Sequence, residues 1–143
     1  GIRRPSTNEG PNMNIYKPED IEEEARLALK DYFTVYVRPL PEQYPLPCLL
    51  LAAAGGSTRN TVDTFTLRID ARAKTDAEAI ETLQNALGAL EEQANQQKGA
   101  LRHVTINSLA SWGSDPARPD LKLCTATVLV TAHRKAVTLN KKT

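Results

Sequence analysis

The chain has 143 residues, a length typical of a single domain. Hydrophobic residues make up 41% of it and charged residues 24%, which excludes wholesale disorder and collagen-like repeats. Eighteen Lys and Arg residues against seventeen Asp and Glu residues leave a net charge of +1, so there is no overall attraction to nucleic acid or to an anionic membrane.

No apolar run approaches the roughly 18 residues of a membrane-spanning helix, so no membrane partner is expected. Cys48 and Cys124 both lie in apolar, strand-like runs. Neither belongs to a CxxC motif or a Cys/His cluster, and we therefore expect no metal site and no cofactor. We predict that both are buried free thiols; the alternative is a disulfide between neighbouring strands.

Residues 1–14 are rich in Gly, Pro, Asn and Ser and hold too few apolar side chains to order themselves. We expect either a flexible arm or a remnant of cloning, since Met13 is the only Met and could be the natural start. The predicted organisation continues with one α+β domain over residues 15–137 and a basic C-terminal tail over residues 138–143.

A first helix is predicted over residues 18–32. Pro18 suits the first helical position, and the acidic residues that follow complement the positive end of the helix dipole. Apolar side chains recur on one helical face at Ile21, Ala25, Ala28, Leu29 and Tyr32. We interpret the acidic run as a solvated face rather than a metal site.

Three strands are predicted next, over residues 34–38, 48–54 and 64–73. The segment PLPEQYPLP between the first two is a stiff, extended connector, because its prolines are incompatible with a central strand. The run CLLLAAA is continuously apolar, as in a strand buried on both faces, and we expect Gly55 and Gly56 to end it. A phosphate-binding loop is not expected there, since its Lys and its following helix are both missing.

The third of these strands alternates strictly. Phe65, Leu67, Ile69, Ala71 and Ala73 point to one face, and Thr66, Arg68, Asp70 and Arg72 point to the other. The second face is predicted to be wet or to contact a partner, with its charges paired across strands or between subunits. The polar segment 56–63 before this strand is predicted to be a loop with Arg59 and Asn60 near its tip.

A second helix is predicted to begin at Thr75, which forms a capping box with Glu78, and to end near Gln96, shortly before Gly99. Two more strands follow over residues 102–109 and 122–133, with a loop between them from Trp112 to Asp120. The predicted fold is therefore α+β, with the order α-β-β-β-α-β-β. A mostly antiparallel four- to five-stranded sheet carries two amphipathic helices on one face.

Catalytic chemistry finds little support in the residue pattern. His103 and His133 lie in different predicted strands, and neither has a nucleophile or a paired carboxylate at a recognised spacing. We interpret both as surface residues, and the prediction is that the protein is not an enzyme. The basic tail could touch phosphates, but we interpret it as a solubilising end.

The segment LRIDARAKTDAEAIETLQNALGAL, which begins at Leu67, resembles the centre of the tail-terminator proteins of long-tailed bacteriophages, also described as minor capsid or tail-completion proteins. PLPEQYPLPCLLLAAAGG is similar to the proline-rich segment and glycine-ended apolar strand of that family, and SWGSDPARPDLKLCTATVLVTAHR to its closing loop and last strand. The likeness covers about residues 18–135 and rests on the order of the elements. The N-terminal arm departs from the family pattern.

The resemblance implies a structural virion protein that forms a homo-oligomeric ring, typically a hexamer, on the head-proximal end of the tail tube. Such a ring ends tube polymerisation and offers a surface to the head–tail connector. The implied partners are the tail tube protein and the connector protein, and DNA would only pass through the ring lumen. Assembly in the host cytoplasm and a final place in the virion follow from the same resemblance.

A ring requires contacts between two different patches on each subunit. On physical grounds we select Arg59 and Asn60 at the loop tip, and Arg68, Asp70 and Arg72 on the alternating strand, as interface residues. Two alternatives remain. One is a head-completion or connector protein of the same virion, and the other is a non-viral intracellular α+β module that binds a small ligand.

Overall fold

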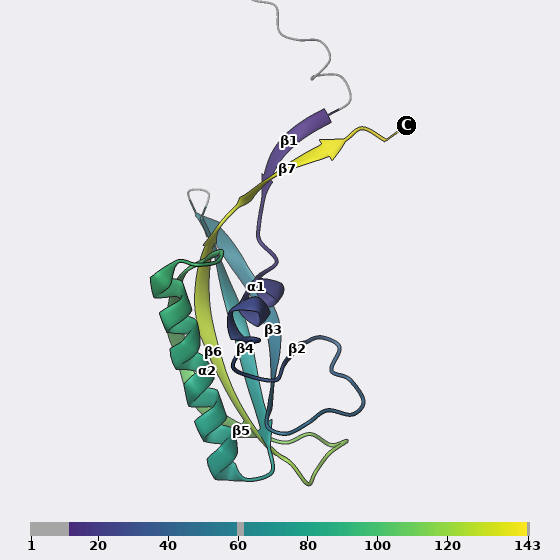
Figure 1. Cartoon of the computed structure of the whole chain (residues 1–143), viewed down its shortest axis with the longest axis vertical. Coiled ribbons are helices and arrows are strands. Elements are labelled where there is room, and N and C mark those ends of the chain that lie inside the picture. Colours follow the sequence, from purple (N-terminus) through teal and green to yellow (C-terminus); the bar gives the residue numbers. More distant parts are fainter. Residues whose placement is uncertain (1–11, 60–61, 143) are drawn as a thin grey trace, which may run out of the picture.

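The computed structural model describes residues 12–59 and 62–142. The elements, in chain order, are β1 (Asn12–Lys17), α1 (Ile21–Leu29), β2 (Val35–Val37), β3 (Cys48–Arg59), β4 (Val62–Ala73), α2 (Asp76–Gln96), β5 (Leu101–Gly113), β6 (Lys122–His133) and β7 (Lys135–Asn140). The fold is α+β, as predicted. Both helices pack on one face of a five-stranded sheet (Figure 1).

The strand order in this sheet is β2-β3-β4-β6-β5. Strand β2 is parallel to β3, and the other neighbours are antiparallel, including the two hairpin pairs expected from the sequence. The core lies between the sheet and the helices. Its largest fully buried side chains include Leu67 and Ile69 of β4, Leu83 and Leu90 of α2, and Leu29 of α1. The predicted apolar face of β4 is therefore confirmed.

Helix α1 is shorter than predicted because Asp20, and not Lys17 before Pro18, is its N-cap. The Asp20 carboxylate accepts a hydrogen bond from the backbone N–H of Glu23 at 3.3 Å, and the helix ends at Leu29. Helix α2 begins as predicted, since the Thr75 hydroxyl accepts from the N–H of Glu78 at 3.2 Å. Its last turn closes with Gln97 in the left-handed conformation, so Gly99 is not the C-cap.

Gly55 and Gly56 do not end β3, which was a wrong prediction. The register with β4 shifts between Ala53 and Gly56, and Gly55 has a φ of 106°, which marks a β-bulge within a continuing strand. The Glu22 carboxylate of α1 accepts from the N–H of Ala53 at 2.7 Å. One of the acidic residues that were predicted to be solvated therefore provides the hydrogen-bond partner for a backbone N–H beside the bulge. The described parts of the predicted loop, residues 56–59 and 62–63, belong instead to β3 and β4.

Strand β5 also exceeds its prediction and continues through Trp112 to Gly113 along β6. The two cysteines are buried and free, as predicted, so the disulfide alternative is wrong. Gly56 is closely packed at the bulge, where a Cβ would lie 2.2 Å from the carbonyl oxygen of Thr64.

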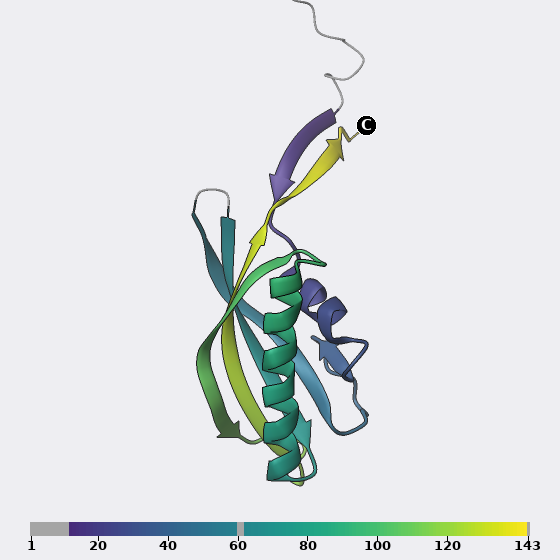
Figure 2. The same cartoon turned by 60° about the vertical axis from the view of Figure 1, so that its left-hand side comes forward.

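A second sheet was not predicted. Strands β1 and β7 pair antiparallel, from Asn12 opposite Asn140 to Lys17 opposite Lys135. We call these two strands the ribbon. It projects beyond the end of the five-stranded sheet at which β3 ends and β4 begins (Figures 1 and 2). The predicted boundaries after residues 14 and 137 both fall inside this ladder, and residues 1–11 lie outside the described part.

Candidate functional site: the open sheet face and the ribbon

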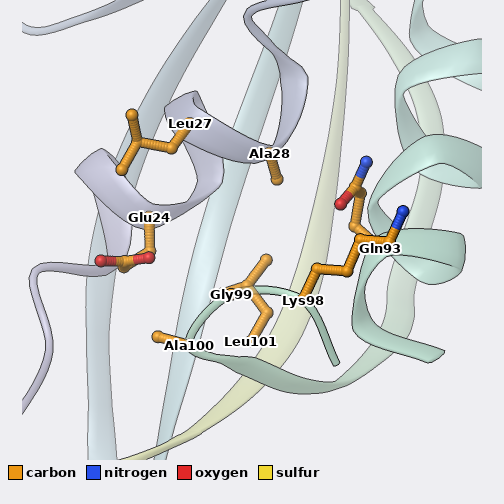
Figure 3. A pocket seen from close by; sticks show the side chains of 8 residues that line it. All are labelled: Glu24, Leu27, Ala28, Gln93, Lys98, Gly99, Ala100 and Leu101. Atoms are coloured by element: carbon orange, nitrogen blue, oxygen red, sulfur yellow. The ribbon is translucent and has the colours of Figure 1, made fainter. Parts of the chain in front are cut away.

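Two cavities border the helices. One, of about 240 Å³, lies between α1 and the turn after α2, where Leu27 and Ala28 approach Ala100 and Leu101 (Figure 3). The other, of about 450 Å³, lies between the chain around Phe33, the proline-rich connector and the start of α2. The polar side chains of the first cavity are Glu24, Gln93 and Lys98, and those of the second come mainly from the first turns of α2.

The described ranges contain no cluster of side chains arranged to bind a metal ion. Over residues 12–59 and 62–142, no three His, Cys, Asp or Glu side chains are placed to hold one metal ion. His103 and His133 are both exposed, on β5 and at the end of β6. Neither helix of the described chain is long and apolar enough to cross a membrane.

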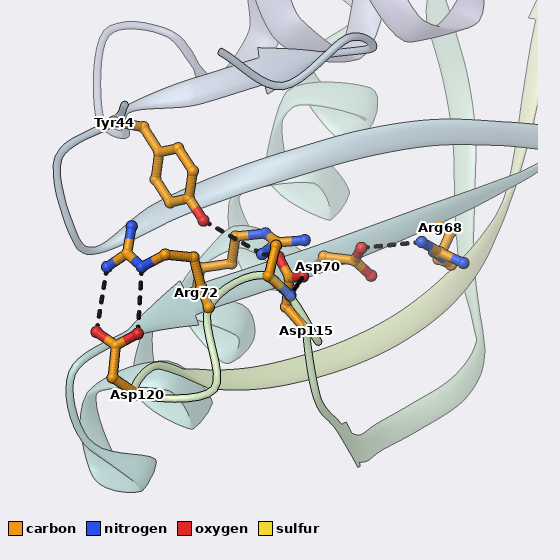
Figure 4. A network of polar contacts seen from close by, with 8 residues as sticks. Tyr44, Arg68, Asp70, Arg72, Asp115 and Asp120 are labelled. Atoms are coloured by element: carbon orange, nitrogen blue, oxygen red, sulfur yellow. Dashed lines mark hydrogen bonds and ion pairs between the residues drawn. The ribbon is translucent and has the colours of Figure 1, made fainter. Parts of the chain in front are cut away.

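Three of the selected interface residues share one face of β4, on the side of the sheet opposite the helices. Only Arg68 is accessible there, with 53% of its side chain exposed. Asp70 is 2% exposed, and its carboxylate accepts from Arg68 at 3.0 Å (Figure 4). The same carboxylate accepts from the Thr125 hydroxyl at 2.8 Å. The expectation of a charged strand face open to solvent or to a partner is therefore wrong at Asp70 and at Arg72, which are buried, but not at Thr66 and Arg68.

Arg72 is only 7% exposed because two loops cover it. Its Nη1 donates to the Asp115 carboxylate at 2.8 Å and to the Tyr44 hydroxyl at 3.3 Å, which joins the proline-rich connector and the loop after β5 to the sheet (Figure 4). The hydrogen bond from Arg72, together with the backbone N–H of Ala117, lowers the pKa of Asp115. Arg72 thus holds two loops of its own chain against the sheet, and we call this set of contacts the Arg72 clamp.

The two interface residues selected at the loop tip, Arg59 and Asn60, fall at the edge of the described chain. Asn60 lies outside the described residues. Arg59 is the last residue of β3, paired along the backbone with Val62, and its side chain is outside the described part. Both stay predictions.

The open face away from these charges is a mixture of half-buried apolar and hydroxyl side chains. They come from four neighbouring strands: Tyr36, Leu50, Ala52, Thr66, Thr127, Leu129 and Thr131. Such a surface of mixed polarity is typical of protein–protein contacts.

The ribbon is the exposed feature that sequence reasoning missed. Cross-strand pairs Met13–Leu139 and Ile15–Val137 place four apolar side chains on one of its faces. Met13 is 61% exposed and Leu139 48%. Alternation in NMNIYK and KAVTLN was the available signal, but nothing local indicates that the two runs pair. The opposite face is mostly polar, with Thr138 bonded to Asn14 at 2.9 Å, and carries Tyr16.

Arg134 fixes the base of the ribbon, between β6 and β7. Its guanidinium donates to both oxygens of Asp63 on β4 at 3.1 Å and to the Thr58 hydroxyl on β3 at 3.1 Å. Asp63 is 3% exposed, and the bonds from Arg134 and then Thr58 lower the pKa of its carboxyl. The ribbon therefore leaves the sheet from an anchored position.

Comparison with known proteins gives no family assignment: no protein-family model matches the chain, and no curated protein sequence matches it significantly.

Proposed function

We propose that the chain is a structural virion protein that caps the head-proximal end of a bacteriophage tail tube as a ring. In this role it ends tube polymerisation and joins the tail to the head. Two arguments support the proposal: the resemblance of residues 18–135 to tail terminators, and the α+β fold, whose helix and strand order agrees with that resemblance over α1 to β6.

The observation that carries the proposal is the ribbon. A ring subunit needs at least two different contact patches. The ribbon presents an uncovered apolar face on a projecting element, and the open sheet face presents a second surface of mixed polarity. Exposed apolar surface on a projecting element is costly for a solitary subunit and is typical of assembly contacts.

The head-completion or connector alternative has one observation of its own. Lys17, Lys135, Lys141 and Lys142 place four cations on or just after the ribbon, and the segments 12–17 and 135–142 contain no acidic residue. A basic lumen would suit a ring near the portal, where DNA passes. The terminator is preferred because the sequence resemblance favours it.

A tube-capping experiment tests the proposal. The protein is added to polymerising tail tubes of its own source, and electron microscopy measures tube length and looks for a ring at one end. We expect single-ended rings and shorter tubes. Attachment to portal-bearing heads instead of tubes would establish the connector alternative, and association with neither would overturn both.

A matched pair of variants sharpens this experiment. The double change Met13→Asp and Leu139→Asp charges the apolar face of the ribbon and is expected to abolish capping. Tyr16→Ser changes the opposite face at a residue that is 73% exposed, and is expected to leave capping intact. Equal capping by the two variants would show that the apolar face of the ribbon is not needed for capping.

A further inference from the structure

Within residues 12–59 and 62–142, no other element covers the apolar face of the ribbon. A two-stranded ribbon is marginally stable in water unless its apolar face packs on something. In the described chain, β1 and β7 make their substantial contacts with each other only. The ribbon points away from both helices (Figures 1 and 2), so its own domain does not supply the missing surface. The apolar face of the ribbon is therefore available to an acceptor on another molecule.

An acceptor of matching character exists on the helix layer. We call it the helix groove: the 240 Å³ cavity between α1 and the turn after α2. Leu27 and Ala28 form one wall, and Ala100 and Leu101 form the other, with polar side chains at the rim (Figure 3). Leu27 of α1 is a large apolar side chain, yet it is 43% exposed.

Charge also matches the ribbon to the helix layer. The ribbon segments carry the four lysines and no carboxylate. At the end of α2 that borders the groove lie Glu91 and Glu92, whereas the other acidic residues of this helix, Asp76, Glu78 and Glu81, lie at its opposite end. Glu24 of α1 lies at the groove itself together with Lys98, and the Arg102 guanidinium donates to the carbonyl of Gly99 in the groove lining. These charges attract a ribbon to a helix layer, whereas two ribbons would repel each other.

We propose that the apolar face of the ribbon of one copy docks in the helix groove of a second copy of this chain. The occupant is taken as a second copy because of the proposed ring, and in that respect the inference rests on the proposed function. The contact joins two different patches, so it is heterologous and repeats from subunit to subunit. Such a contact closes into a ring when the rotation per subunit permits.

Cysteine cross-linking tests the contact even where association is weak. One full-length chain carries Met13→Cys on the ribbon and a second, of different tag length, carries Leu27→Cys in the groove. The native Cys48 and Cys124 are 1% and 0% exposed and do not compete. The two are mixed under a mild oxidant, and denaturing electrophoresis measures the mixed dimer. The matched control replaces the groove chain with Leu109→Cys, an apolar residue 72% exposed on β5.

The expected result is several-fold more mixed dimer with Leu27→Cys than with Leu109→Cys, and a yield that falls as salt increases because the lysines assist docking. Equal yields with the two chains would overturn the proposal. A predominance of cross-links between two Met13→Cys chains would also overturn it, in favour of ribbon–ribbon pairing. If Met13→Cys misfolds, Leu139→Cys replaces it on the same face and must give the same pattern.

Tube capping by the unmodified chain is measured separately. A protein that caps tubes but gives no specific cross-link retains the proposed function and lacks this contact. A protein that cross-links through the groove but never caps tubes retains the contact and is not a terminator.

Discussion

Arg134 and Asp63 form a bidentate ion pair at the junction between the five-stranded sheet and the ribbon. The guanidinium Nε and Nη2 each lie 3.1 Å from one carboxylate oxygen. The Thr58 hydroxyl also donates to Asp63 at 2.5 Å. Because the carboxylate is nearly inaccessible, these three donors replace the water that would otherwise solvate its charge. The ion pair thus ties Arg134, which connects β6 to the ribbon, to Asp63 on β4, and Thr58 on β3 supports it.

The pair predicts a pH-dependent contribution to stability. Its bonds lower the pKa of Asp63 below the ordinary value of 3.8, so the stabilisation is present above about pH 4 and is lost as pH falls through the native pKa. Asp63→Asn should reduce the free energy of unfolding by about 1–3 kcal/mol at pH 7. Below pH 4, the difference from the unmodified protein should shrink. Urea unfolding at several pH values measures it.

Asp31→Asn is the control for this prediction. The Asp31 carboxylate is 75% exposed and lies 3.3 Å from Lys30. Exposed pairs contribute little, so this variant should follow the unmodified protein at every pH. If both variants gave the same pH profile, the junction pair would have no special role.

The Arg72 clamp predicts a coupling energy that an exposed pair lacks. In a double-mutant cycle of Arg72→Ala and Asp115→Ala, the coupling should be at least about 1 kcal/mol, because Arg72 is buried and its Nη1 donates to the Asp115 carboxylate at 2.8 Å, whereas its buried Nε has no partner in the described residues. The cycle of Arg118→Ala and Asp120→Ala should give a clearly smaller coupling, since that pair is exposed and solvent screens it. Equal coupling in the two cycles, measured by urea unfolding, would contradict the clamp.

The sequence predicted elements whose signals are local. Helix α2 shows its Thr75 cap and its apolar stripe, and β6 shows strict alternation, and both were placed correctly. The glycine pair was misread because a β-bulge and a strand end share the same local signal. The bulge is specified by the partner strand and by Glu22, which lies on α1.

The candidate site was less predictable because burial on a sheet face depends on distant segments. Asp70 and Arg72 alternate with apolar residues as an exposed face would, yet Tyr44 and Asp115, from two loops far apart in the chain, cover Arg72. The ribbon was missed for a related reason. Its two strands lie near opposite ends of the chain, and periodicity within each cannot indicate their pairing.

Two glycines should respond oppositely to alanine. Gly56→Ala places a methyl group against the Thr64 carbonyl, where the backbone must move, and should lower the free energy of unfolding by about 1–3 kcal/mol. Gly88→Ala lies in the exposed middle of α2 with nothing within 4 Å of the new Cβ, and should raise stability by about 0.5–1 kcal/mol. Thermal and urea unfolding measure both. Destabilisation by Gly88→Ala would indicate a close contact there that the structure does not contain.

The native thiols should be unreactive until the chain unfolds. Burial raises the pKa of Cys48 to about 11, with the Arg72 charge only partly opposing it, and burial also raises the pKa of Cys124. At pH 8 both are protonated and inaccessible, so a disulfide reagent such as Ellman's should modify them at least about a hundredfold more slowly than in denaturant. The added thiol of Met13→Cys is the control and should react at once in the folded protein. Rapid reaction of the unmodified chain would contradict this prediction and would mean that the sheet opens near β3. In that case Arg72→Ala should accelerate the reaction further, because the connector would lose the hydrogen bond between Tyr44 and Arg72.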